Sequence, residues 1–315
     1  MNVLYRKTLD GICIQRCYGL DGMVELPKEI EGRAVMELER YAFSQTVRGR
    51  EVPPKNYEGE PEICGVGLEE LTLPRYVKRV GAYALYNCFR LKALSCWSTV
   101  EDWGAGVFTG CSALAHLDIR ICPGTKSCFK DILSELHQTL VVDYRDEEGE
   151  QKAKLIFPEY FEESVENTPA RIIMREMHGC GHMYRCCFEG QIFQFRKYDR
   201  LFPHVQVQEE PKLVTQLAIY RLYWPCDLTE EAGEHYWQYV KIHPEETAEG
   251  LIRRGELDIL KWAAGKPQIG REELEKMLRA ASRLGSAQAS ALLMDEKHRR
   301  FGKEMKKTPG RTFEL

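Results

Sequence analysis

The apolar positions of the chain recur with a fixed offset of 23 residues between Leu68 and Ile119. Leucine occupies the same slot in three consecutive segments, at Leu71, Leu94 and Leu117. Valine, glycine and cysteine slots between these leucines return at the same offset. A shared offset at this many positions indicates a structural repeat whose units stack, because one unit cannot bury its own apolar side alone.

Each repeat begins with an alternating segment that predicts a short strand, with its leucines turned inward and the residues between them outward. Cys88 and Cys111 share one slot of the repeat, and a small, weakly polar thiol suits a tight buried corner. If the protein binds a partner protein through the strands, we expect the contact at the outward positions. These are Glu70, Thr72, Ala93, Ser95, His116 and Asp118. The alternative is that the repeats only support the rest of the chain.

The repeat reads L-x-x-L-x-L-P-x-x-V-x-x-V/I-G-x-x-A-hydrophobic-x-x-C-x-x-L, and this pattern resembles the BspA-like (Treponema-type) leucine-rich repeats. The resemblance covers about a third of the chain and is specific as to fold. It implies a bacterial leucine-rich solenoid and a role in protein or surface binding. It names no ligand.

The sequence around the repeats predicts a cap at each end of the solenoid. Residues 1–44 form an N-terminal cap with one imperfect coil, in which Leu38 aligns with Val80. An insertion at 45–67 is rich in proline and glycine and predicts an irregular loop. An apolar stripe at helical spacing predicts a helix over 127–138 that closes the open end, so the first domain spans residues 1–139.

Residues 140–212 are predicted to be a small β-rich middle region with two hairpins. The first hairpin pairs 140–144 with 154–157, and the second pairs 183–188 with 191–195. The sequence supports no family assignment for this region.

Residues 213–315 are predicted to be α-helical and to resemble ankyrin repeats. Thr229 is the expected N-cap of one helix, since two acidic residues follow it. Two helix–turn–helix units surround Gly255 and Gly285, which lie 30 residues apart, close to the ankyrin period. The fold class is therefore α+β: a short leucine-rich solenoid of about 23-residue repeats, a β-rich middle and a helical C-terminal domain.

Composition restricts the partner and the compartment. The net charge of −4 argues against nucleic acid, which needs a basic face. No apolar run approaches the roughly 18 residues of a membrane span, and the start of the chain has no apolar segment typical of a signal peptide. With 12 cysteines and no export signal, we expect reduced thiols and a cytoplasmic location.

One Cys/His cluster is a candidate for metal chemistry. His178, Cys180, His182 and Cys186 offer nitrogen and sulfur ligands that could surround a tetrahedral zinc ion. The competing interpretation is a glycine turn that enters a strand whose cysteines pack in a core. Trp97 is interpreted as a core or edge residue rather than a stacking platform.

The sequence as a whole predicts a non-enzymatic protein–protein interaction or scaffold module without a cofactor. Stacked repeats offer extended surfaces without enclosing a catalytic cleft. The alternative is a metal-binding or thiol enzyme centred on the segment His178 to Cys187. Partner identity and oligomeric state cannot be read from the sequence.

Overall fold

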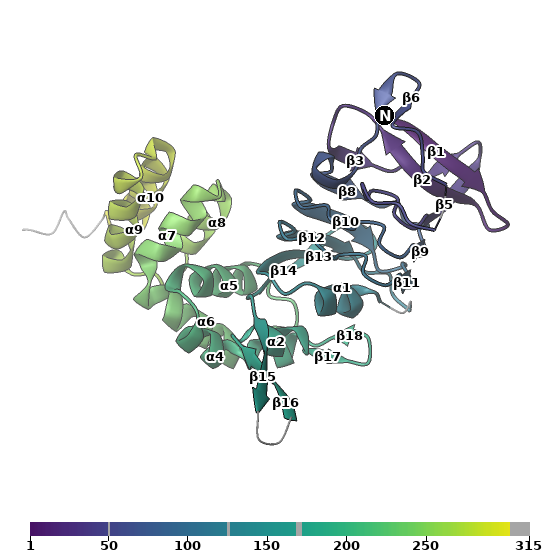
Figure 1. Ribbon diagram of the computed structural model, residues 1–315. Helices are drawn as coiled ribbons and strands as arrows, with labels where there is room; N and C mark the ends of the chain where they lie inside the picture. The colour runs from purple at the N-terminus through teal and green to yellow at the C-terminus, as the bar shows by residue number, and fades with distance from the viewer. Residues whose placement is uncertain (50, 125–126, 168–171, 303–315) are drawn as a thin grey trace, which may run out of the picture. The chain divides into compact units, whose positions relative to one another are not determined.

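The computed structural model describes residues 1–49, 51–124, 127–167 and 172–302, and within 165–175 only the backbone of the two strands is described. The chain forms two compact units, Met1–Leu201 and Phe202–Leu315 (Figure 1). The first unit is a β-solenoid followed by short hairpins and helices, and the second unit is helical.

A six-stranded sheet forms one side of the solenoid. Its strands, in spatial order, are β14 (Gln151–Phe157), β13 (Leu140–Arg145), β12 (His116–Arg120), β10 (Ala93–Trp97), β8 (Glu70–Thr72) and β3 (Met23–Glu25). All neighbours are parallel except β13 and β14, which form an antiparallel hairpin.

The buried side of this sheet is a ladder of stacked apolar residues. Leu94 lies opposite Leu71 on one side and Leu117 on the other, and all three are buried. Val24 and Val142 extend the ladder by one rung at each end. The repeat predicted from the 23-residue offset is therefore confirmed as a solenoid, and β13 adds a fifth parallel rung to the three repeats and the imperfect first coil.

A second sheet forms the other side of the coils. Its path is β1 (Asn2–Lys7), β2 (Ile12–Tyr18), β5 (Arg33–Leu38), β9 (Arg79–Val80) and β11 (Asp102–Trp103), with β4 (Glu29–Ile30) paired to β5. Leu38 lies opposite Val80, as the alignment of the imperfect first coil predicts. The coil interiors between the two sheets hold the apolar core of this unit.

The turn that follows the second sheet has a fixed conformation in each coil. Tyr41, Tyr83 and Gly106 occupy the same slot, and all have positive φ values of 59°, 57° and 65°. The two tyrosine rings stack with centroids 5.4 Å apart. Gly104, two residues earlier, lies so close to the preceding coil that a Cβ there would be 2.4 Å from the amide nitrogen of Ala82. Position 104 therefore needs glycine.

The repeated cysteines hold the coils together. The Sγ of Cys88 donates to the carbonyl of Phe43 at 3.4 Å, and the Sγ of Cys111 donates to the carbonyl of Leu85 at 3.2 Å. Each bond joins one coil to the coil before it. Burial raises the pKa of Cys111 to about 12 and raises the pKa of Cys88 as well, so both remain protonated donors at neutral pH.

The segments around the solenoid match the sequence predictions in part. The insertion 45–67 contains a short hairpin, β6 (Asn56–Tyr57) and β7 (Glu60–Pro61), and a 3-10 turn at Gly65–Gly67. A helix, α1 (Phe129–Glu135), forms within 127–138 as predicted. The solenoid does not end there, because β13 continues the same sheet as the next rung.

The remainder of the first unit combines hairpins with short helices. It contains β15 (Phe161–Asn167), β16 (Ile172–His178), α2 (Gly181–Arg185), β17 (Phe188–Glu189), β18 (Ile192–Phe193) and α3 (Phe195–Asp199). The hairpin predicted at 140–157 is confirmed. The second predicted hairpin is confirmed only as the pair β17–β18, and its expected strand over 183–188 begins instead as helix α2.

Arg185 explains why α2 is helical. Its guanidinium is buried and donates to the carbonyls of Leu136, Pro158 and Gly181. These bonds hold the segment against the preceding loops, which outweighs the strand preference of its apolar residues. A Cβ at position 181 would lie 2.0 Å from the Pro158 carbonyl oxygen, so the helix starts at a glycine.

The second unit consists of helices only, within the residues described. They are α4 (Phe202–Gln208), α5 (Pro211–Tyr223), α6 (Glu230–Ile242), α7 (Pro244–Arg253), α8 (Leu257–Ala264), α9 (Arg271–Arg283) and α10 (Ala287–Phe301). Thr229 caps α6 as predicted, since its hydroxyl accepts from the amide of Ala232 at 3.3 Å. Gly255 and Gly285, with φ of 72° and 65°, form the turns inside the pairs α7–α8 and α9–α10.

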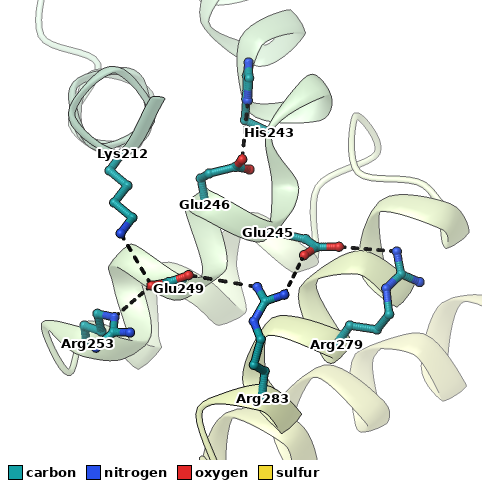
Figure 2. A network of polar contacts seen from close by, with 8 residues as sticks. All are labelled: Lys212, His243, Glu245, Glu246, Glu249, Arg253, Arg279 and Arg283. Carbon is teal, nitrogen blue, oxygen red and sulfur yellow. Dashed lines mark hydrogen bonds and ion pairs between the residues drawn. The ribbon is translucent and has the colours of Figure 1, made fainter. Parts of the chain in front are cut away.

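An ion-pair network joins three of these helices (Figure 2). Glu249 on α7 contacts Arg253 at 2.9 Å, Lys212 of α5 at 3.7 Å and Arg283 of α9 at 3.9 Å. Glu245, one turn earlier, also contacts Arg283, at 3.2 Å. The Arg253 hydrogen bond is the main reason that the pKa of Glu249 lies below its ordinary value of 4.5; burial acts in the opposite direction, and the neighbouring cations add to the decrease.

We expect Glu249→Gln to reduce the acid sensitivity of the second unit. A carboxylate with a depressed pKa stabilises the fold above its unfolded-state pKa, and this stabilisation is lost as the pH falls through the folded-state pKa. The difference in unfolding free energy between wild type and variant should be at most about 1 kcal/mol at pH 7. It should decrease as the pH falls below the ordinary carboxyl pKa and disappear below the folded-state pKa of Glu249, in urea titrations followed by hydrogen exchange of α7. Glu246→Gln is the matched control, since Glu246 has one ion pair, to His243 at 3.8 Å; an equal effect there would contradict the assignment.

Candidate interaction surface

The outward face of the solenoid sheet carries the predicted binding residues in two rows. Glu70, Ala93 and His116 lie opposite one another on adjacent strands. The second row contains Thr72, Ser95 and Asp118. The structure thus brings all six together on one face, because the 23-residue offset sets the register of the strands.

The row of Thr72, Ser95 and Asp118 continues into Asp143 of β13, whereas the row of Glu70, Ala93 and His116 continues into Val141. Asp143 accepts hydrogen bonds from His116 Nε2 at 3.1 Å and from Gln151 Nε2 at 2.8 Å. Arg145 Nε donates to Asp118 Oδ2 at 2.7 Å. Burial raises the pKa of Asp143, but the hydrogen bond from His116 and the nearby cations outweigh burial and hold this pKa below its ordinary value. One end of the face is therefore a fixed polar network.

The row of Thr72, Ser95 and Asp118 lines a groove of about 660 Å³. The groove starts at Glu25 and Lys28 beside the first rung. Its remaining walls are formed by residues at the carboxyl ends of the strands and just after them. They include Pro74, Arg75, Tyr76, Trp97 and Arg120.

Trp97 lies between two arginines in this groove. The guanidinium carbon of Arg75 lies 5.2 Å from the centre of the indole ring, and that of Arg120 lies 5.0 Å from it. Arg75 also forms an ion pair with Glu147 in the turn between β13 and β14. The prediction that Trp97 is a core or edge residue misses this role: the ring is half-buried and supports two cations.

The 23-residue offset predicts part of the contact between Trp97 and the two arginines. Arg120 follows Trp97 by one repeat, so the two face each other on neighbouring strands. Glu147 has no such signal, because it reaches Arg75 from a turn 72 residues away in sequence.

The residues of the alternative metal site do not come together as a ligand set. His178 on β16 stacks on Phe161 and forms an ion pair with Glu163 at 3.2 Å. Cys180 is fully buried. Only His182 and Cys186 meet, with Nε2 and Sγ 3.9 Å apart, on the turn of helix that the sequence did not predict. Among the described residues, no group of three or more His, Cys, Asp or Glu is placed to hold a metal ion.

The thiols are mostly unsuited to nucleophilic chemistry at neutral pH. All twelve cysteines lie within the described residues, and ten of them are buried. Burial raises the pKa of Cys187 to about 12 and that of Cys64 to about 11, whereas a nucleophilic cysteine needs its thiolate form. Cys64 and Cys187 therefore act as packing residues, and Cys187 donates a weak hydrogen bond to the carbonyl of Met183 at 3.6 Å.

Comparison with known proteins gives one structural likeness. No family model and no curated protein matches the chain. A solved structure described as "Crystal structure of T. pallidum Leucine Rich Repeat protein (TpLRR)" is similar to 46% of this chain and 80% of its own, with 22% sequence identity and a TM-score of 0.22. Among the helices that the structure describes, none has the length and apolarity required to cross a membrane.

Proposed function

We propose that this chain is a non-enzymatic protein-interaction module that binds another protein through the outward face of its solenoid sheet. The observation that carries the proposal is the strand register, which places six outward residues in two rows across three adjacent strands. These residues are Glu70, Thr72, Ala93, Ser95, His116 and Asp118. Stacked repeats produce such extended faces, and partners commonly dock on them.

The groove on this face suits a polypeptide better than a small molecule. Small-molecule pockets are concave and mainly apolar, with a few polar groups inside. This groove is open and lined by hydroxyl, carboxylate and guanidinium groups such as those of Ser95, Asp118 and Arg120. Trp and Arg are enriched where proteins bind proteins, and both are present at its end.

We infer the finer classification from the sequence pattern together with this architecture. The repeats are of the BspA-like type, and the helical pairs around Gly255 and Gly285 are ankyrin-like. Residues 1–139, 140–212 and 213–315 are the proposed functional regions. The ten buried cysteines, which pack as small apolar side chains, support a reducing, cytoplasmic setting in a bacterium, and the net charge of −4 favours protein over nucleic acid as the partner.

Site-specific crosslinking in the native host tests the proposal. A photoreactive benzoylphenylalanine at position 95 should crosslink a discrete partner protein, because this position is in the middle of the face. The same group at position 101 is the control, since the Glu101 side chain is 63% exposed and lies on the turn before β11, away from this sheet. Crosslinks of equal strength at both positions, or at position 101 alone, would contradict a binding role for the sheet face.

A further inference from the structure

We propose that the groove binds an extended acidic peptide segment whose carboxylate is held by Arg120 and Arg75 at the edge of Trp97, and that Glu147 competes for this position from within the chain. This inference rests on the proposed function and specifies the chemistry of the partner. Three observations support it: the two arginines beside Trp97, the acidic turn that bears Glu147, and the size of the groove.

The arginine pair is the first observation. Two guanidinium groups lie within 5.2 Å of one indole ring. An aromatic ring holds the planar face of a guanidinium while its N–H donors stay available at the edge. A carboxylate beside the ring would accept from both groups and relieve the repulsion between them. Arg120 is exposed, so an incoming acid can reach it.

Glu147 shows that a carboxylate fits this position. Its ion pair with Arg75 bridges the end of the groove, and the turn that carries it is held by Arg145, which donates to the carbonyl of Gly149 at 3.3 Å. The side chains of Arg75 and Glu147 remain 45% and 34% exposed. Exposed ion pairs contribute little, so an external carboxylate can displace this one.

The groove fits a short stretch of extended chain. It crosses the strands β3, β8, β10 and β12, a width of about 14 Å at the usual strand spacing. About four extended residues cover that width. Thr72 and Ser95 present hydroxyl groups along it, which can donate to and accept from a peptide backbone.

The same groove disfavours a polyanion. Glu25, Asp118 and Glu147 place negative charge at both ends and in the middle of the site. A nucleic-acid strand carries a phosphate at every step and would meet these carboxylates repeatedly. A peptide in which single acidic residues alternate with neutral ones places its charge at the arginines alone.

Fluorescence anisotropy with the full chain tests the inference. The probe is a fluorescein-labelled octapeptide of alternating Thr and Glu, compared with one of alternating Thr and Gln, in low and high salt. We expect the acidic probe to bind more tightly, and Arg120→Met to weaken it about five-fold. Glu147→Gln should strengthen binding about three-fold, because it releases Arg75.

Glu148→Gln is the matched control for the competition. It removes the same charge from the same turn, but the ion pair with Arg75 is formed by Glu147, and the Glu148 side chain is exposed. Equal gains in Glu147→Gln and Glu148→Gln would overturn the competition, as would failure of the acidic probe to bind or tighter binding of a single-stranded oligonucleotide. If the probe fails while position 95 still crosslinks a partner protein, the acidic chemistry is wrong and the proposed function stands; failure of both removes the function as well.

Discussion

Replacing Leu94 with aspartate is expected to unfold the solenoid while the helical unit stays folded. Leu94 is the middle rung of the apolar ladder, fully buried, with Leu71 and Leu117 on either side. A carboxylate there is buried without a partner, and the leucine packing is lost as well. The combined loss is about 5 kcal/mol or more, which is comparable to the whole stability of a typical domain.

Hydrogen exchange with peptide-level mass spectrometry measures this outcome in both units at once. Strands β8, β10 and β12 should lose their protection, whereas α7 and α9 should keep theirs. Ala93→Asp is the control: it places the same carboxylate on the neighbouring residue of the same strand, which is half-buried on the outward face. Its effect should be within about 1 kcal/mol, mostly from the like charge of Glu70 opposite. Retained protection in Leu94→Asp would show that this leucine is not a core rung.

The sequence predicts the parts of this fold that depend on local period. The 23-residue offset specifies the pairing of Leu71 with Leu94 and of Leu94 with Leu117, because a strand register follows directly from a constant repeat length. The cap at Thr229 is equally local, since the hydroxyl and the amide it serves are three residues apart.

The fifth rung could not be recognised from the 23-residue offset, because the spacing to it is different. Val142 lies opposite Leu117 but follows it by 25 residues, because helix α1 replaces the turn of an ordinary coil. With the register shifted, β13 resembles the start of an independent hairpin.

Helix α2 and the groove could not be predicted because their determinants are distant in sequence. The segment 183–188 has apolar residues that suit a strand. Its first part is helical because Arg185 donates hydrogen bonds to the carbonyls of Leu136, Gln138 and Pro158. In the groove, Arg75 meets Glu147 across 72 residues. The outward rows of the candidate site were predictable from alternation, whereas the cations at their end depend on how the acidic turn folds back.

The second large effect is expected for Arg185→Met. The Arg185 side chain is 6% exposed, and its donors reach four backbone carbonyls, those of Leu136 at 2.7 Å, Pro158 at 2.5 Å, Gly181 at 3.0 Å and Gln138 at 2.6 Å. Burial lowers the pKa of this guanidinium to about 10, so it is still charged at neutral pH. Methionine has a similar length but no donor, and it leaves the four buried carbonyls without this partner. Each such group costs about 1 kcal/mol or more, so we expect a loss of about 4 kcal/mol in total.

Two further variants separate hydrogen bonding from charge. Arg185→Lys keeps the charge but cannot reproduce the planar fork, so it should lose about half as much as methionine. Arg200→Met removes an exposed arginine at the end of α3 and should change stability by no more than about 0.5 kcal/mol. Native-state hydrogen exchange of β14 measures all three, since a loss of about 4 kcal/mol accelerates exchange through opening by several hundred-fold. If lysine restores wild-type protection, the positive charge alone stabilises this region; if methionine does, the carbonyls find other donors and Arg185 does not hold α2 in place.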